Sequence, residues 1–247
     1  MKIGVFKFAS CDGCQIAFFE ISKELIKMDV DIQYFLEAQS ENHFDHFDIS
    51  FVEGSISTPE QEERIKQIRE KSKKVAVIGA CAVSGGIQSV RNFMDFFDVL
   101  SSVYPSPDYI KSLEKSKPVS DYIDVDYELR GCPINKSQLL EIISSLYLGK
   151  EPVLPSYPLC LECKIKGIPC VLILGKPCLG SITVAGCGAI CPSFSRGCYG
   201  CFGPIKNPNI QSLKEVFENH GFGDIYSHIL TGFNAYNREF RGNDEKD

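Results

Sequence analysis

Eight cysteines lie in one short stretch of this sequence, and four more are spread over the first 132 residues. Thiolates bind zinc and iron–sulfur clusters, and paired thiols form disulfides. The number and spacing of these residues therefore indicate one of three kinds of chemistry. The eight cysteines of the stretch are Cys160, Cys163, Cys170, Cys178, Cys187, Cys191, Cys198 and Cys201.

The start of the sequence and its net charge indicate the cellular compartment and exclude one class of partner. The opening residues "MKIGVFKFAS" contain an apolar run too short for the core of a signal peptide, and no twin-arginine pair occurs. No run approaches the roughly 20 apolar residues that span a bilayer. We therefore expect a cytoplasmic protein without direct membrane insertion, where reducing conditions disfavour disulfides. The formal net charge of -6 argues against nucleic acid as a partner, because no basic surface is available to neutralise phosphates.

Iron–sulfur clusters fit the remaining pattern better than zinc. Two CxxC pairs, Cys160 with Cys163 and Cys198 with Cys201, suit tetrahedral zinc sites. Zinc leaves the four cysteines between these pairs unexplained. A four-iron cluster takes four thiolates, so the eight residues of the stretch supply two clusters and the other four supply a third. The sequence favours three [4Fe-4S] clusters, with a zinc-stabilised scaffold as the alternative.

The first part of the chain alternates strand and helix patterns. Helical patterns separate five short runs that are rich in apolar and β-branched residues. This alternation predicts an α/β fold, with a doubly wound parallel sheet that resembles flavodoxin. The predicted strands are residues 2–8, 30–35, 47–53, 74–79 and 122–129.

Several helices are predicted from their starting residues or their apolar pattern. Thr58, followed by Pro59 and Gln61, is typical of an N-cap with a capping-box partner. Asn135 can cap a helix that ends at Gly149, and a last helix is expected near 210–219.

The aromatic segment "NFMDFFDVL" at 92–100 is predicted to be a helix that packs in the core. The alternative is that it contacts a partner subunit.

The four early cysteines follow predicted strands. Cys11 and Cys14 come after the first strand, Cys81 after the fourth and Cys132 after the fifth. The carboxyl ends of parallel strands lie along one edge of a sheet, so we expect these thiols to converge and hold one cluster. The alternative is that Cys81 and Cys132 are small buried apolar residues. Glu53 ends the third strand, where it either contacts the cluster or accepts N–H bonds from the neighbouring turn.

The composition changes near residue 150. Three prolines form a linker there, and the next fifty residues are rich in glycine, proline and cysteine with almost no periodicity. We therefore expect a flavodoxin-like domain at 1–149 that holds one cluster. Residues 150–247 are expected to form a small irregular cluster domain with a C-terminal helix, held by metal rather than by an apolar core. The polar end "RGNDEKD" is expected to be disordered.

Five motifs together resemble one known family, the small, electron-transfer subunit of [NiFe] hydrogenases. They are "CDGC" (11–14), "VEGSIST" (52–58), "GACAVSGG" (79–86), "GCPIN" (131–135) and "GCYGCFGP" (197–204). The resemblance covers nearly the whole chain and is nearest to the cytoplasmic group. That group includes the delta subunit of sulfhydrogenases and the gamma-type subunits of F420-linked or methyl-viologen-reducing hydrogenases. The 20 kDa subunit of complex I is similar only in the first half, uses adjacent cysteines and lacks the eight later ones.

The resemblance implies a partition of the twelve cysteines among three [4Fe-4S] clusters, with no catalytic residue in this chain. Cys160 stands where periplasmic relatives have a histidine ligand, and Cys191 stands where a proline leaves them a three-iron centre. The implied proximal ligands are Cys11, Cys14, Cys81 and Cys132. The implied medial ligands are Cys187, Cys191, Cys198 and Cys201. The implied distal ligands are Cys160, Cys163, Cys170 and Cys178.

The resemblance also implies a function and partners. The chain would relay single electrons between the nickel–iron site of a separate large subunit and an acceptor subunit. That acceptor would be a flavin-containing diaphorase or an iron–sulfur subunit, linked to nicotinamide or to F420. The alternatives are a cluster relay subunit of another reductase and a zinc-stabilised scaffold.

Overall fold

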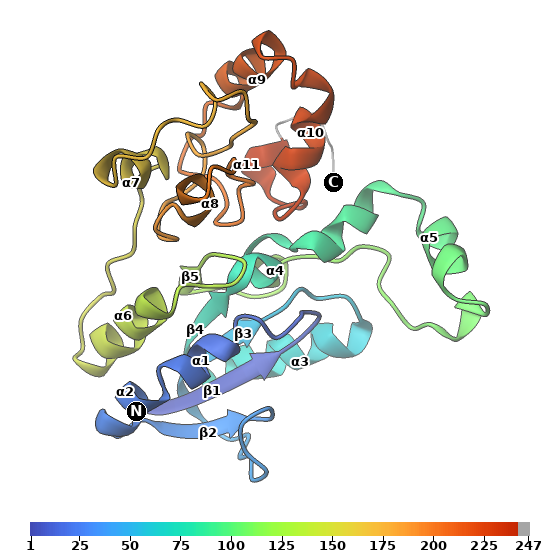
Figure 1. The fold of residues 1–247 in the computed structure, drawn as a ribbon. Coiled ribbons are helices and arrows are strands. Elements are labelled where there is room, and N and C mark those ends of the chain that lie inside the picture. The colour runs from blue at the N-terminus through green and yellow to red at the C-terminus, as the bar shows by residue number, and fades with distance from the viewer. Residues whose placement is uncertain (242–247) are drawn as a thin grey trace.

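The computed structural model describes residues 1–241, and a five-stranded parallel sheet lies at the centre of its first half (Figure 1). The strand order β2-β1-β3-β4-β5 is that of flavodoxin. The predicted α/β fold is therefore confirmed, and the first four strands have limits close to those expected, whereas the fifth, predicted at 122–129, begins only at Tyr127. The strands are β1 (Lys2–Lys7), β2 (Asp31–Phe35), β3 (Phe47–Glu53), β4 (Ser72–Ile78) and β5 (Tyr127–Leu129).

Helices cover both faces of this sheet. On one face, Val5 and Phe51 pack against α1 (Ile16–Glu20), α2 (Ser22–Lys27) and α6 (Lys136–Tyr147). On the other face, the next residues along the same strands pack against α3 (Pro59–Glu70). Because successive strand side chains point to opposite faces, both sides of β1 and β3 are buried.

Two predicted helix starts are confirmed by their capping hydrogen bonds. The hydroxyl of Thr58 accepts the N–H of Gln61 at 3.2 Å, and Gln61 Oε1 accepts the N–H of Thr58 at 3.2 Å, which forms the expected capping box of α3. Asn135 Oδ1 accepts the N–H of Ser137 at 2.8 Å at the start of α6. These side chains satisfy backbone donors that the first helical turn leaves without partners.

A segment between β4 and β5 projects to the side of the sheet as an arm (Figure 1, green). Its helix α5 starts after Asp95, whose Oδ1 accepts the N–H of Asp98 at 2.9 Å, and only Leu100 of this helix is buried. Phe93 and Phe97 are 44% and 61% exposed. The prediction that 92–100 packs in the core is therefore wrong, because an apolar pattern does not say whether this chain itself covers it. The elements are α4 (Gly79–Ser84), η1 (Ile87–Phe93), α5 (Phe96–Val103), η2 (Pro107–Tyr109) and η3 (Val119–Asp121).

The cysteine-rich region forms a second lobe above the carboxyl edge of the sheet (Figure 1). The expected helix near 210–219 is present as α9, whereas α10 was not predicted. Phe217 of α9 packs against Tyr226 and Leu230 of α10 and against Leu179, so this lobe has a small apolar core of its own. We expected metal rather than an apolar core to hold this lobe together, and for the part around these residues that expectation is wrong. The helices are α7 (Cys160–Ile165), α8 (Ile190–Ser193), α9 (Ile210–Asn219), α10 (Gly223–Thr231) and α11 (Arg238–Arg241).

Across residues 1–241, no helix has the length and apolar character needed to cross a membrane. Most of the C-terminal segment "RGNDEKD", for which disorder is expected, lies outside the described residues.

Asp126 joins β4 and α3 just before β5 begins, and its substitution gives a test of this part of the fold. Its Oδ2 accepts the N–H of Val75 at 2.8 Å and an Arg69 N–H at 2.7 Å, and its Oδ1 accepts Lys74 Nζ at 2.9 Å. Burial alone would raise the pKa of Asp126, but these three donors outweigh it and hold the pKa below its usual value.

We expect Asp126→Asn to lower the free energy of unfolding by about 1–2 kcal/mol at pH 7. A depressed folded-state pKa gives stability that is present above the unfolded-state pKa of about 3.9 and lost as pH falls through the folded-state value. Anaerobic denaturant unfolding should therefore show the difference between the two proteins narrowing below about pH 4. A difference that does not change with pH would contradict this assignment.

Candidate metal centres

The four early cysteines meet at the carboxyl edge of the sheet. Cys11 and Cys14 follow β1, Cys81 lies in α4 directly after β4, and Cys132 follows β5. Their thiols are electrostatic neighbours: charge on Cys81 or Cys132 acts on Cys14, and charge on Cys132 or Cys11 acts on Cys81. The structure thus brings together residues that are 121 positions apart in the sequence, and we call them the sheet-edge group.

The protonation chemistry of the sheet-edge group suits a metal. Burial, with added repulsion from neighbouring thiolates and Glu53, raises the pKa of Cys14 far above its usual value and that of Cys81 to about 11. Burial also raises the pKa of Cys132. Thiols in this environment hold their protons at neutral pH unless a cation compensates the charge, and metal binding supplies that compensation.

Two glycines leave space for sulfur in the sheet-edge group. A Cβ on Gly86 would lie 2.6 Å from Cys81 Sγ, and a Cβ on Gly79 would collide with Cys14 Sγ. Both residues have positive φ, at 63° and 84°, which side-chain-bearing residues rarely adopt. The backbone therefore approaches these two thiols more closely than any other residue type allows.

Polar side chains also surround the sheet-edge group. Glu53 is 2% exposed, and its Oε1 accepts the N–H of Cys14 at 3.2 Å. This bond supports the interpretation of Glu53 as an acceptor of N–H bonds from the turn that carries Cys14.

Gln88, which no motif in the sequence indicates, donates to Ala9 O at 2.6 Å and accepts from Cys81 Sγ at 3.4 Å. The hydroxyl of Ser10, beside Cys11, is buried with no partner among the described residues, as fits a donor toward a cluster sulfur.

Four of the later cysteines, two on α7 and two after it in the chain, are called the outer group: Cys160, Cys163, Cys170 and Cys178. Charge on the other three acts on Cys163, whose pKa burial raises to about 11. Cys178 is buried in a small apolar cluster with Leu159 and Val171, whereas Cys170 is exposed.

The last four cysteines form a middle group: Cys187, Cys191, Cys198 and Cys201. Charge on Cys187 and Cys191 acts on Cys201, whose pKa burial raises to about 12, and charge on Cys201 acts on Cys198. Charge also acts between the outer and middle groups, from Cys187 on Cys163 and from Cys178 on Cys198, so the division of the eight later cysteines into two sets of four remains what the family resemblance implies.

Hydrogen bonds join the loops of the middle group to those of the other two groups. The N–H of Cys198 donates to Cys178 Sγ of the outer group at 3.2 Å. On the other side, the loop of Cys132 contacts the loop of Cys201: Arg130 Nη1 donates to Pro204 O at 2.6 Å, and charge on Cys132 acts on Cys201. The loops that carry the three groups are therefore in contact, and between the middle and outer groups a thiol sulfur accepts directly from the backbone.

A buried asparagine forms hydrogen bonds with both lobes. Asn234 is 2% exposed and its amide donates to Gly200 O at 2.5 Å, beside Cys201. Its Oδ1 accepts the hydroxyl of Ser84 at 2.6 Å, at the end of the helix that carries Cys81. No motif in the sequence indicates this role, because Asn234 is 150 residues from Ser84.

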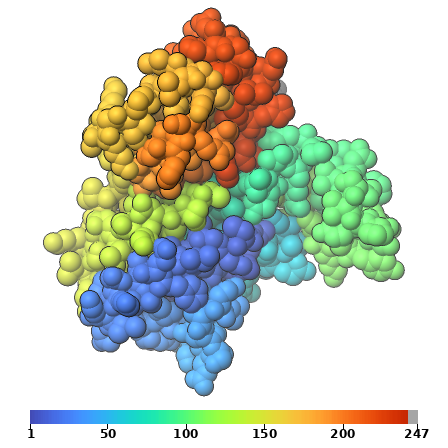
Figure 2. Space-filling model, in the orientation of Figure 1, coloured from blue at the N-terminus to red at the C-terminus, as the bar shows by residue number. Residues whose placement is uncertain are grey.

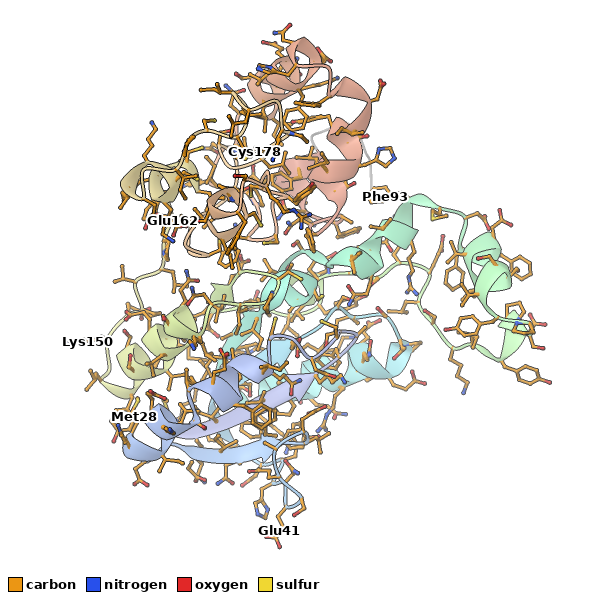
Figure 3. The ribbon with its side chains drawn as sticks, viewed as in Figure 1. Met28, Glu41, Phe93, Lys150, Glu162 and Cys178 are labelled. Carbon is orange, nitrogen blue, oxygen red and sulfur yellow. The ribbon has the colours of Figure 1, made fainter. Side chains whose placement is uncertain are left out.

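A carboxylate on α7 holds the loop that carries Cys187. Figure 3 marks Glu162 on α7 and Cys178 inside the same lobe. Glu162 Oε1 accepts the N–H of Gly186 at 2.9 Å, and its Oε2 accepts the N–H of Ala189 at 2.9 Å. Lys166 Nζ donates to Gly188 O in the same loop. The helix that presents two outer-group thiols therefore also positions a middle-group thiol.

We expect Glu162→Gln to raise the midpoint potential of a cluster held by the middle group by roughly 50 mV. A unit charge within about 10 Å contributes roughly 1.5 kcal/mol at an effective dielectric constant near 20, before screening by solvent, and 59 mV corresponds to about 1.4 kcal/mol for one electron. Glutamine keeps one acceptor for the loop but removes the charge. Redox-poised EPR measures this shift in potential. Glu215→Gln, at an exposed position of α9, is the control and should leave the potential unchanged. An unchanged or lower potential would argue against this role of Glu162.

Within residues 1–241, no three His, Cys, Asp or Glu side chains gather closely enough around one point to hold a single metal ion. A four-iron cluster sets a different requirement, because each of its four thiolates binds a different iron.

Comparison with known proteins identifies relatives of this chain. The family described as "NADH ubiquinone oxidoreductase, 20 Kd subunit" matches residues 11–146. The sulfhydrogenase 2 subunit delta of Pyrococcus furiosus is 34% identical over 88% of this chain and 92% of its own length. A subunit of the vhu F420-non-reducing hydrogenase of Methanocaldococcus jannaschii is 34% identical, with 82% of each chain covered. The similarity to these two relatives thus extends beyond residue 146 into the cysteine-rich lobe.

Solved structures agree with the fold. A chain of an NAD+-reducing [NiFe]-hydrogenase in the H2-reduced state superposes with a TM-score of 0.58 at 25% identity, covering 63% of this chain and 95% of that one. A chain of the actinobacterial-type NiFe-hydrogenase from Ralstonia eutropha H16 gives a TM-score of 0.60 at 16% identity, covering 83% and 79%. At that lower identity the second likeness concerns the fold alone.

Proposed function

Because this chain belongs to the family of the 20 Kd subunit of NADH ubiquinone oxidoreductase, and within it to the hydrogenase subunits, we propose that it carries electrons in a cytoplasmic [NiFe] hydrogenase. In this proposal each group of four cysteines holds one [4Fe-4S] cluster: the sheet-edge group is proximal, the middle group medial and the outer group distal. Residues 1–149 form the domain that holds the proximal cluster, and residues 150–247 form the domain that holds the other two.

Contacts between neighbouring cysteine loops support the proposal that three groups of four thiols lie in series. Arg130, in the loop of Cys132, donates to Pro204 O in the loop of Cys201 at 2.6 Å, and the N–H of Cys198 donates to Cys178 Sγ at 3.2 Å. A zinc scaffold needs no such order, because structural zinc sites act independently of one another. An electron relay does need such an order, because each electron enters at one end of the series and leaves at the other.

The residues of this chain contribute position, burial and hydrogen bonds. When bound, the clusters would supply one-electron chemistry at potentials that depend on net charge, hydrogen bonding to sulfur and exposure to solvent. Cys14, Cys178 and Cys198 are buried, which keeps water away from the inner thiols. The N–H of Gly200 donates to Cys198 Sγ at 3.3 Å, a bond that stabilises negative charge on the sulfur.

The arm is the natural contact for the large subunit, which would carry the nickel–iron site. It leaves the sheet at α4, the helix of Cys81, and exposes Phe93, Met94 and Phe97. Contiguous exposed apolar side chains of this kind mark protein–protein contacts. At the other end of the series, the outer group would face a flavin-containing or iron–sulfur acceptor subunit linked to nicotinamide or F420.

Anaerobic purification of the native complex tests the proposal. The expected result is a nickel-containing partner together with about twelve irons per copy of this chain, three clusters of four irons each. A colourless, zinc-containing protein would replace the proposal with the zinc-stabilised scaffold. An iron-rich complex whose large subunit lacks nickel would replace it with a relay for another reductase.

A further inference from the structure

The arm is closed at its base by side chains of η1. Ser89 Oγ and Asn92 Nδ2 both donate to the carbonyl of Ser116, each at 2.7 Å, and the N–H of Ser116 donates back to Asn92 Oδ1 at 2.8 Å. Nearby, Arg91 Nη2 donates to Leu113 O at 3.0 Å. The chain that leaves for the arm is therefore bonded to the chain that returns from it. We call Ser89, Arg91, Asn92, Leu113 and Ser116 the arm clamp.

The period of η1 separates its clamping residues from its exposed ones. In a 3₁₀ helix, residues three apart lie on the same side. Ile87, Val90 and Phe93 are 65%, 41% and 44% exposed, and we call them the apolar stripe. Ser89 and Asn92, which are also three apart, bond to the returning chain instead. Fixing one side of η1 therefore fixes the direction in which the apolar stripe points.

A cluster of buried hydroxyls joins the arm clamp to the sheet. Ser116 Oγ lies 2.8 Å from the Oγ atoms of both Ser55 and Ser57, which follow β3 in the chain, and Ser55 and Ser116 are fully buried. A buried polar cluster whose members are satisfied makes the surrounding structure rigid. Next to it, the N–H of Lys117 donates to Ile56 O at 3.0 Å. The returning chain is therefore bonded to the sheet as well as to η1.

The same helix contacts the sheet-edge group. The amide of Gln88 donates to Ala9 O at 2.6 Å, and its Oε1 accepts from Cys81 Sγ at 3.4 Å. Ala9 in turn pairs with Ser55 of the buried hydroxyl cluster through two backbone hydrogen bonds, of 3.2 and 3.0 Å. One side of η1 therefore holds the arm while another contacts a thiol. The apolar stripe keeps a fixed position relative to that thiol as long as the arm clamp is closed.

The rest of the arm has little packing of its own. Leu100 is the one buried residue of α5, and Phe97 on the same helix is 61% exposed. Figure 2 shows the arm, in green, projecting from the side of the molecule. An exposed segment that becomes ordered only on contact loses binding free energy to the entropy of ordering. A segment that is already fixed at its base avoids part of that cost.

We propose that the arm clamp holds the arm in its docking position before the large subunit binds, with Asn92 as the positioning residue. The arm then docks as a preformed element rather than folding on contact. This inference rests on the proposed function, in which the arm contacts that subunit. Asn92 is the central residue because, alone among the described side chains of η1, it gives both a donor and an acceptor to one residue of the returning chain.

Hydrogen exchange of the full-length, iron-loaded chain under anaerobic conditions tests the arm clamp itself. Asn92→Leu removes both bonds to Ser116 and keeps a side chain of similar size. The Ser116 N–H loses its acceptor directly, so the informative amides are those of Leu113 and Lys117, whose own backbone acceptors after β3 are untouched. Both should exchange about tenfold faster, because the loss of two hydrogen bonds favours opening of the returning chain.

Asn42→Leu is the matched control. Asn42 Oδ1 accepts the N–H of Phe35 at 2.7 Å, and its Nδ2 donates to Gln39 O at 2.9 Å, in the loop after β2 at the far edge of the sheet. This variant also loses one donor and one acceptor, but it should leave exchange in the returning chain unchanged. Equal acceleration there in both variants would overturn the inference. Acceleration at the Ser116 amide alone in Asn92→Leu would also overturn it.

Association of the same chains with the separately prepared, nickel-bearing large subunit tests the consequence for docking. A chain whose arm is free to move can dock only while the arm is in place, so its association is slowed by that fraction. We expect Asn92→Leu to slow association about tenfold and to change dissociation little. Phe93→Ser, which removes a contact, should mainly speed dissociation, and Asn42→Leu should change neither rate.

The outcomes separate this inference from the proposed function. Unchanged association of Asn92→Leu, with the wild type binding the large subunit, would refute the inference and leave the proposed function in place. Loss of iron from Asn92→Leu would also refute it, because Asn92 would then act on the sheet-edge group rather than on the arm. A wild-type chain that binds no nickel-bearing subunit would instead refute the proposed function, and this inference with it.

Discussion

Cys81→Ala is expected to abolish hydrogen-dependent reduction of methyl viologen by the complex. Cys81 lies at the start of the helix from which the arm leaves the sheet, at the end of the series that would face the large subunit. Without its thiolate the sheet-edge group cannot hold a four-iron cluster, and about four of about twelve irons should be lost. Exchange between hydrogen and deuterium should persist, because that reaction would belong to the proposed nickel-bearing partner. Iron analysis and the two rate measurements check the prediction.

Cys170→Ala provides a matched control at the other end of the series. It should cost the same amount of iron, but electrons can still leave from the sheet-edge and middle groups to a small dye. Reduction of methyl viologen should therefore persist in this variant, while reduction of a protein acceptor falls. Equal loss of dye reduction in both variants would contradict the serial order of the three groups.

Gly79→Ala is expected to remove the same cluster without touching a ligand. The new Cβ would collide with Cys14 Sγ, and alanine disfavours the φ of 84° that this position requires. Iron content should fall by about one third, with loss of the EPR signal of one cluster. The thiol has nowhere to move, because Cys14 is buried and its N–H is held by Glu53.

Gly175→Ala is the control for Gly79→Ala. It introduces the same backbone strain but no collision with a thiol. Gly175 has a φ of 69°, and its Cβ would meet no atom within 4 Å. Alanine there costs about 1 kcal/mol of strain, as it does at Gly79, but touches no sulfur. This variant should keep its full complement of iron. If both variants lose iron to the same degree, strain alone accounts for the effect, and the proposed close approach at Gly79 is wrong.

Much of the first lobe follows from local signals. Thr58 and Asn135 begin helices because their side chains satisfy backbone donors within three residues, so the information lies in adjacent positions. The five strands follow from short β-rich runs, and their parallel arrangement follows from the intervening helices. The prediction for the arm was wrong because Phe93 and Phe97 are apolar without being covered by this chain. Composition alone does not distinguish an apolar side chain that packs internally from one that is exposed for a partner.

The second lobe was less predictable. Short helices such as α7 and α8 have no periodicity long enough to detect, and their ends depend on contacts with distant loops. Glu162 illustrates the difficulty: it sits between two cysteines on α7, but its partners Gly186 and Ala189 are more than twenty residues away. Asn234 lies still further from the helix it holds. Such residues become identifiable only when the loops they join are seen together.

The sequence by itself indicated metal-binding thiols, because twelve cysteines in a chain of this composition favour clusters over disulfides. It also determined the edge of the sheet at which four of them meet, because the direction of parallel strands follows from strand–helix alternation. Only the tertiary structure decided how the cysteine loops contact one another, through Arg130 to Pro204 and through Cys198 to Cys178. These contacts depend on how irregular loops fold back on one another. Local sequence preferences do not predict the course of these loops, because the hydrogen bonds that stabilise them form only between segments far apart in the chain.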